Sequence, residues 1–120
     1  MRTIELEKIL SVMDDMDRLV KEVNSRYERG DNLDPVDSGF LIIRENLEKV
    51  LNSEGIFRIG TFVGDRFDHN IHDAIGTHEL DDFERYEAEF RDDQVYQIVR
   101  SGWKTDEGVL VRPVQVIVSC

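Results

Sequence analysis

The sequence predicts an α+β protein in which two helices come first and a small, mostly antiparallel β domain follows. Two observations support this order. Apolar residues recur with helical spacing in the first part of the chain, and after Gly55 the pattern changes to short alternating stretches that are typical of strands. We therefore expect residues 1–54 to form a helical dimerisation region and residues 55–120 to form the β domain.

The first helix is predicted by apolar residues that alternate three and four positions apart over three heptads. Leu10 and Leu19 widen this stripe, as a helix bundle requires. Two helices cannot cover a stripe of this width, so we expect two chains to form a four-helix bundle as a homodimer. The residues expected at the dimer interface are Leu6, Ile9, Met13, Met16, Val20 and Val23 of the first helix and Phe40, Ile43 and Leu47 of the second.

Residues that end and start helices define the second helix. The Gly-Asp-Asn sequence at residues 30–32 is expected to end the first helix. Asp34 is a predicted N-cap because Pro35 follows at the first helical position. Gly55 is expected to end the second helix just after Ser53.

Beyond Gly55, glycines separate short stretches with strand-like alternation. The stretch 81–93 interrupts them with seven acidic residues against Arg85 and Arg91, which gives a net charge of -5. We interpret it as a solvated excursion between two strands. The strands are expected within residues 56–59, 74–80, 94–100 and 109–118.

Composition excludes several classes of partner and compartment. The chain has 120 residues and a formal net charge of -11, which disfavours nucleic acid and anionic membranes as partners because both are polyanions. The single cysteine, Cys120, excludes an internal disulfide and suits a reducing compartment. The polar, acidic start does not read as a signal peptide, and no apolar run approaches the ~20 residues that cross a bilayer. A soluble, cytoplasmic protein is expected.

Residues 67–75 read Phe-Asp-His-Asn-Ile-His-Asp-Ala-Ile and form the most distinctive motif. Asp68 can cap a short helical turn, which would place Ile71 and Ile75 on one face. A corner between strands with no direct function is the alternative for this motif taken alone. Further along, Gly102 and Trp103 begin a predicted hairpin whose turn lies near residues 104–108.

This order of parts resembles the GrpE family, the nucleotide exchange factors of DnaK-type heat-shock chaperones. The family pattern reads Phe/Leu-Asp-Pro-Asn-x-His-x-Ala-hydrophobic, then Gly-aromatic, then Leu/Ile-Arg-Pro/Ala-x-x-Val-x-Val, and it is matched within residues 5–118. The resemblance implies a dimer whose β domain opens the ATPase cleft of the chaperone and promotes ADP release. It implies a co-chaperone that is not an enzyme, that has no cofactor and that does not itself bind the nucleotide.

The resemblance also implies which residues contact the chaperone. Gly39 matches a small-residue position in the second helix, where close packing between the helices is an equal alternative to partner contact. The residues carried over are Phe67, His69, Asn70, Val99, Val109 and Arg112 in the β domain and Arg18 and Gly39 in the helices.

Several departures from the family pattern leave other functions open. His69 stands in place of the usual proline and Trp103 in place of tyrosine or phenylalanine, the acidic stretch 81–93 is longer than usual, and the family's long N-terminal stalk is not matched. A dimeric scaffold or inhibitor that docks on a chaperone without exchange activity is the main alternative. A small metal-dependent enzyme is a weaker one, because His69, His72 and His78 lack the spacing of a known metal-binding motif.

Overall fold

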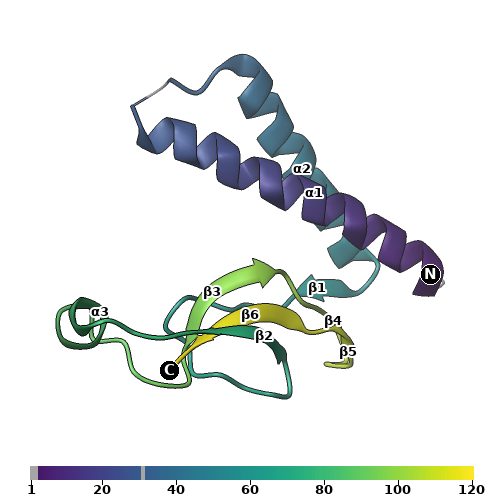
Figure 1. The fold of residues 1–120 in the computed structure, drawn as a ribbon. Helices are drawn as coiled ribbons and strands as arrows, with labels where there is room; N and C mark the ends of the chain where they lie inside the picture. Colours follow the sequence, from purple (N-terminus) through teal and green to yellow (C-terminus); the bar gives the residue numbers. More distant parts are fainter. Residues whose placement is uncertain (1–2, 31) are drawn as a thin grey trace. The chain divides into compact units, whose positions relative to one another are not determined.

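The computed structural model describes residues 3–30 and 32–120, shown as a ribbon in Figure 1. The chain divides into two compact units, Met1–Gly55 and Ile56–Cys120. The first unit holds two long helices and the second holds the strands, which confirms the predicted α+β order. None of the described helices is both long and apolar enough to cross a membrane.

The helical unit consists of α1 (Thr3–Glu28) and α2 (Pro35–Ser53), joined as a hairpin. The predicted cap is confirmed, because the side chain of Asp34 accepts a hydrogen bond from the N–H of Asp37 at 2.8 Å. Gly30 and Gly55 follow the two helices with φ of 92° and 78°, a left-handed conformation that glycine adopts without strain.

Two ion pairs join the helices of the hairpin. Arg44 Nη2 lies 2.9 Å from Asp17 Oδ1, and Arg26 Nη2 lies 3.1 Å from Asp37 Oδ1. Both pairs are partly buried, so solvent screens them less than it screens a fully exposed pair. They link α1 and α2 at two places along the hairpin.

The β unit contains two three-stranded sheets. In the first, β4 (Trp103–Thr105) lies between β1 (Ile56–Arg58) and β5 (Leu110–Arg112), and both pairings are antiparallel. In the second, β6 (Val114–Ser119) lies between β2 (His72–His78) and β3 (Val95–Arg100). β6 is antiparallel to β3 and parallel to β2.

The core of the β unit forms around the central strand β6. Alternate residues of this strand are buried, as its apolar period of two predicts. Ile59 and Val95 complete the buried cluster, while Phe67, Ile71 and Ile98 pack against it partly exposed. The β6 residues of the cluster are Val114, Val116 and Val118.

One expectation for the strands was wrong in detail. The run 109–118 is not one strand, because Pro113 separates β5 from β6 and proline has no N–H to donate to a ladder. The stretch 81–93 is a largely exposed excursion between β2 and β3, as predicted, but it contains a short helix that was not predicted, α3 (Asp82–Tyr86). Asp81 and Glu84 form a capping box at its start.

Candidate functional site

Residues 68–72 form a tight corner that leads into β2. The side chain of Asp68 accepts a hydrogen bond from the N–H of Asn70 at 2.9 Å, and its carbonyl accepts from the N–H of His72 at 2.8 Å. The strand starts at His72, so Ile75 lies on β2 and is exposed. The predicted capping of a turn by Asp68 is confirmed, whereas the expectation that Ile71 and Ile75 lie on one helical face was wrong.

His72 holds this corner together from inside. Only 5% of the residue is exposed, and its Nδ1 accepts a hydrogen bond from the N–H of Asp68 at 3.0 Å. Because Nδ1 is an acceptor, Nε2 carries the proton and donates to Thr61 Oγ1, 3.2 Å away. Burial lowers the pKa of His72, and the carboxylates of Asp68 and Asp65 oppose this only in part.

Phe67 joins the corner to the core and to a neighbouring pocket. Its ring packs against the buried cluster around β6 and lies 5.9 Å from the ring of His72. Its N–H donates to the carbonyl of Asp93 at 2.8 Å, which ties the corner to the end of the acidic stretch. Phe67 is thus a half-buried residue that supports the surface as well as contributing to it.

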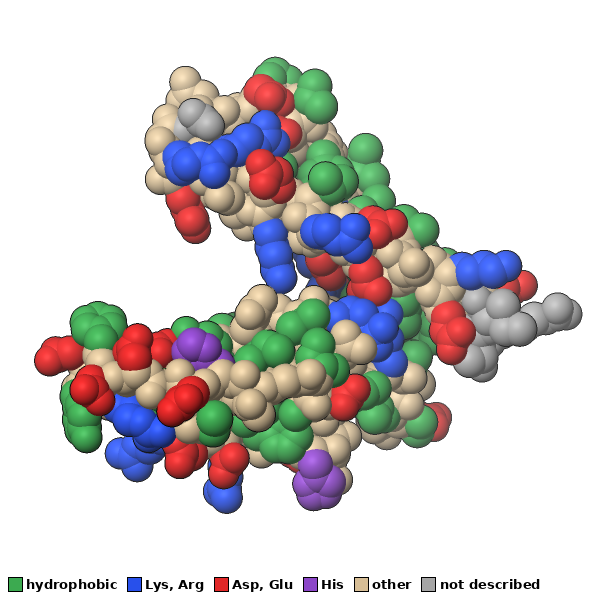
Figure 2. Space-filling view, viewed as in Figure 1, with side chains coloured by type: hydrophobic (Ala, Val, Ile, Leu, Met, Phe, Trp, Pro, Cys, Tyr) green, Lys and Arg blue, Asp and Glu red, His purple; other side chains and the backbone are tan. Residues whose placement is uncertain are grey.

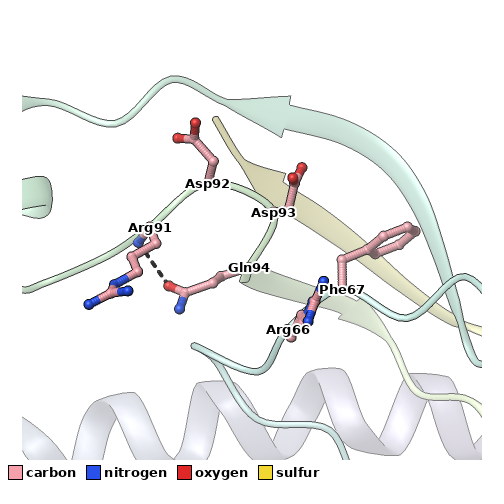
Figure 3. Close-up of a pocket in the computed structure, with 6 residues that line it drawn as sticks. All are labelled: Arg66, Phe67, Arg91, Asp92, Asp93 and Gln94. Atoms are coloured by element: carbon pink, nitrogen blue, oxygen red, sulfur yellow. Dashed lines mark hydrogen bonds between the residues drawn. The ribbon is translucent and has the colours of Figure 1, made fainter.

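The pocket beside Phe67 has a volume of about 650 Å³ and is drawn in Figure 3. The N–H of Arg91 donates to Gln94 Oε1 at 3.0 Å across its floor, while the carboxylates of Asp92 and Asp93 point to the opposite side from the Arg91 side chain. A lining with both charges suits a polar protein surface better than an apolar small molecule. The lining residues are Arg66, Phe67, Arg91, Asp92, Asp93 and Gln94.

Val109 and Arg112 lie on the β4–β5 hairpin. Thr105 and Val109 close this hairpin with an N–H to carbonyl bond of 2.8 Å, and Gly108 has a φ of 83° in the turn. Val109 is 59% exposed, whereas Arg112 is partly buried and donates from Nε to the carbonyl of Ser101 at 3.1 Å. Val109 is therefore the more accessible of the two predicted contact residues.

Gly102 and Trp103 fix where this hairpin starts. A Cβ atom at Gly102 would lie 2.5 Å from the backbone nitrogen of Val114, so the position accepts no side chain. Trp103 is fully buried, and the guanidinium of Arg58 lies 4.7 Å from the centre of its ring. The Gly-aromatic pair is thus a packing element and not an exposed contact.

The structure brings together only part of the predicted contact set. His69 and Asn70 are exposed at the corner directly after Phe67. Val99 is exposed near the end of β3. It lies four residues after Val95, the first residue of that strand, which corresponds to about 13 Å along the strand. Arg112 lies on β5 in the other sheet, and Val109 directly precedes that strand.

The two contact residues predicted in the helical unit are both on its surface. Arg18 is largely exposed and pairs with Asp15 at 3.1 Å, one helical turn away. A Cβ atom at Gly39 would meet no described atom within 4 Å. Close approach of α1 and α2 within one chain therefore does not explain the glycine, and close packing against a helix of a second chain stays a prediction.

The residues predicted at the dimer interface differ in exposure within one chain. Leu6, Met13 and Val23 are buried, and Ile43 is exposed. A second apolar set, which is not among the predicted interface residues, is also exposed and follows a seven-residue spacing. This set comprises Val12 and Leu19 on α1 and Val36 and Val50, on either side of Ile43, on α2. The remaining predicted residues, Ile9, Met16, Val20, Phe40 and Leu47, are partly buried.

The three histidines have different surroundings. His72 bonds to Thr61, His78 Nε2 lies 3.0 Å from Glu84 Oε1, and His69 is exposed. Across residues 3–30 and 32–120, no three His, Cys, Asp or Glu side chains are grouped so that they could hold a metal ion.

Sequence reasoning missed the structural role of His72 and the helix α3. The role of His72 depends on Thr61, eleven residues upstream, and no local pattern indicates that pairing. The helix had a visible signal, since Asp81 and Glu84 are spaced as in a capping box.

Comparison with known proteins agrees with this arrangement. The chain is 33% identical over 114 residues to Protein GrpE of Pseudothermotoga lettingae, which covers 95% of this chain and 58% of the relative. It is 30% identical over 112 residues to Protein GrpE of Thermotoga petrophila, with coverage of 93% and 55%. Protein GrpE of Chlorobium phaeobacteroides is 28% identical over 120 residues, with coverage of 98% and 59%.

The chain thus spans little more than half the length of these curated relatives. The sequence profile of the GrpE family matches residues 5–120, which include both the helical hairpin and the β unit. The chain belongs to the GrpE family.

Proposed function

We propose that this protein is a nucleotide exchange factor that opens the ATPase cleft of a DnaK-type chaperone and promotes ADP release. The observation that carries the proposal is the family match over residues 5–120, supported by relatives named Protein GrpE. Such a factor is a co-chaperone and not an enzyme, and it needs no cofactor. The compartment that we propose is the cytoplasm, where the free thiol of Cys120 would stay reduced.

The proposed mechanism is differential binding to the open and closed forms of the chaperone. A partner shifts such an equilibrium only by as much as its affinities for the two forms differ. By linkage, ADP then weakens the binding of the exchange factor by the same factor. Weakening ADP binding on the order of 100-fold requires about 2.7 kcal/mol of differential binding, since each factor of ten corresponds to about 1.36 kcal/mol.

A rigid surface suits this mechanism, because little binding energy is then lost in ordering the loops. The buried His72 and its bonds to Asp68 and Thr61 support the corner that displays His69 and Asn70. We propose these two residues as polar contacts. Val99 and Val109 are the proposed apolar contacts, with Phe67 and Arg112 supporting them from partly buried positions.

We further propose that two chains associate through their helices. The exposed residues Val36, Ile43 and Val50 are seven apart on α2, a spacing typical of a seam between packed helices. Val12 and Leu19 on α1 are also exposed and seven apart. Burying such stripes against a second copy would remove apolar surface from water, and each Å² removed would stabilise the dimer by about 25 cal/mol. Arg18 and Gly39 remain candidate contacts for the chaperone in this unit.

Release of a fluorescent ADP analogue from the DnaK-type chaperone of the same organism tests the function. We expect the protein to accelerate release on the order of 100-fold. Binding that leaves the release rate unchanged would contradict exchange activity and favour the dimeric scaffold or inhibitor. If exhaustive chelation lowered the melting temperature or the exchange rate, the metal-dependent alternative would return.

A further inference from the structure

Two exposed aromatic side chains stand on the short helix α3. Phe83 is 68% exposed and Tyr86 is 76% exposed. They are three residues apart, so both leave the helix on the same side. Figure 2 shows hydrophobic side chains beside acidic ones at the end of the β unit that carries α3 in Figure 1. An exposed aromatic pair with a polar rim is typical of a protein contact surface.

The helix that carries this pair is held firmly in place. Glu84 Oε1 accepts hydrogen bonds from the N–H of Asp81 at 3.1 Å and from His78 Nε2 at 3.0 Å, while Oε2 accepts from the hydroxyl of Tyr96. The rings of His78 and Tyr96 stack with their centres 3.9 Å apart, and Phe90 packs against Tyr96. Because α3 is already ordered in the free protein, binding of a partner would cost little conformational entropy in this helix.

Charge indicates the chemistry of that partner. The stretch 81–93 has a net charge of -5, and one of its two arginines, Arg85, already pairs with Asp92 at 3.2 Å. Carboxylates around an aromatic pair favour a partner surface that carries Lys or Arg beside apolar groups. A second α3 face, with the same net charge of -5, is disfavoured as the occupant of this surface by repulsion.

The position of the stretch indicates which partner brings that surface. The stretch 81–93 ends at Asp93, just before β3. The carbonyl of Asp93 accepts a hydrogen bond from the N–H of Phe67, and residues 91–94 line the pocket beside Phe67. The stretch that carries α3 therefore ends beside the corner that we propose for chaperone binding. We infer that the α3 face, with Phe83 and Tyr86 at its centre, is an additional docking surface for a basic, partly apolar segment of that same chaperone. This inference rests on the proposed function.

Binding kinetics of the full-length protein with the DnaK-type chaperone of the same organism test this surface. We expect the double variant Phe83→Ser, Tyr86→Ser to dissociate on the order of 10-fold faster, because aromatic contact centres act mainly on the dissociation rate. The charge variant Asp82→Asn, Glu87→Gln should instead associate more slowly and with a weaker dependence on salt. Ile75→Thr, which removes an exposed apolar group from β2, is the matched control and should keep both rates.

Each outcome decides the matter. Unchanged rates in the aromatic variant, or an equal loss in Ile75→Thr, would overturn the α3 surface while leaving the proposed function intact. If the native protein binds without accelerating ADP release, exchange activity fails but the rates still decide the α3 surface. If the native protein does not bind the chaperone, both proposals are wrong. Melting curves of all variants should match that of the native protein, since these side chains are exposed.

Discussion

Asp68 and His72 are joined by two hydrogen bonds that run in opposite directions. The N–H of Asp68 donates to His72 Nδ1 at 3.0 Å, and the N–H of His72 donates to the carbonyl of Asp68 at 2.8 Å. The motif at residues 67–75 is thus stabilised from within, because the buried imidazole of His72 accepts a hydrogen bond from a backbone N–H of the turn. His69 and Asn70, which lie between these two residues, are both exposed.

Acid should destabilise the protein through His72. Burial lowers the pKa of His72 below 6.5 in the folded state, so below pH 6.5 the unfolded chain binds more protons than the folded chain. The stability contributed by the neutral imidazole is complete above pH 6.5 and is lost as the pH falls toward the lowered pKa. We expect His72→Gln to flatten the pH dependence of the free energy of unfolding between about pH 7 and 5.

Chemical denaturation at several pH values measures this effect. His69→Gln is the matched control because His69 is exposed in the same motif, and it should keep the native pH dependence. The idea fails if His72→Gln loses stability with falling pH as steeply as the native protein does.

The parts of the fold that local chemistry determines could be predicted from the sequence. Asp34, Pro35 and Gly55 define the ends of α2 through capping and backbone preferences that act within a few residues. The parallel pairing of β2 with β6 could not be predicted, because it joins segments about forty residues apart. The break at Pro113 was visible in the sequence, but the apolar run around it was read as one strand.

The candidate site shows the same division. A contact role for exposed residues such as His69 and Val109 could be predicted only from the family resemblance, because exposed contact residues form no local pattern in the sequence. The hydrogen bond between His72 and Thr61 depends on the fold that brings them together. The capping box that begins α3 was overlooked, because the strong negative charge of residues 81–93 was interpreted as the sign of a solvated excursion.

Gly102 should not tolerate even a methyl group. A Cβ atom there would lie 2.5 Å from the nitrogen of Val114 and 2.8 Å from the carbonyl carbon of Pro113, and both are backbone atoms that cannot rotate away. We expect Gly102→Ala to lower the free energy of unfolding by about 1–3 kcal/mol. Gly60→Ala is the control, because a Cβ atom there meets no described atom within 4 Å. Equal melting temperatures for the two variants would contradict the close approach.

A charge at the exposed seam of α2 should separate the proposed dimer. Ile43 is exposed in the single chain, so Ile43→Asp leaves the hairpin intact but would bury a carboxylate between two chains. We expect a monomer in sedimentation at micromolar concentration. Lys49→Asp places a carboxylate at an exposed position of α2 away from the face of Ile43 and should stay dimeric. Ile43→Asp protein that sediments as a dimer would exclude this seam.

Phe67 and Val109 should respond differently to truncation. Phe67 packs against the core around Val95, so Phe67→Ala should lower the free energy of unfolding by about 2 kcal/mol or more, whatever it does to binding. Val109 is 59% exposed on the β4–β5 hairpin, so Val109→Ser should leave the melting temperature within a degree or two.

If Val109 contacts the chaperone, Val109→Ser should slow ADP release on the order of 5-fold, the effect of losing about 1 kcal/mol at the interface. Melting and ADP release must be measured on the same samples, because a destabilised protein also loses activity. Val63→Ser is the matched control, since Val63 is a similarly exposed valine in another turn of the β unit and is not among the proposed contacts. Native exchange rates in stably folded Val109→Ser protein would remove Val109 from the contact surface. A lower rate with an unchanged melting curve would place the working face of the β unit at this hairpin.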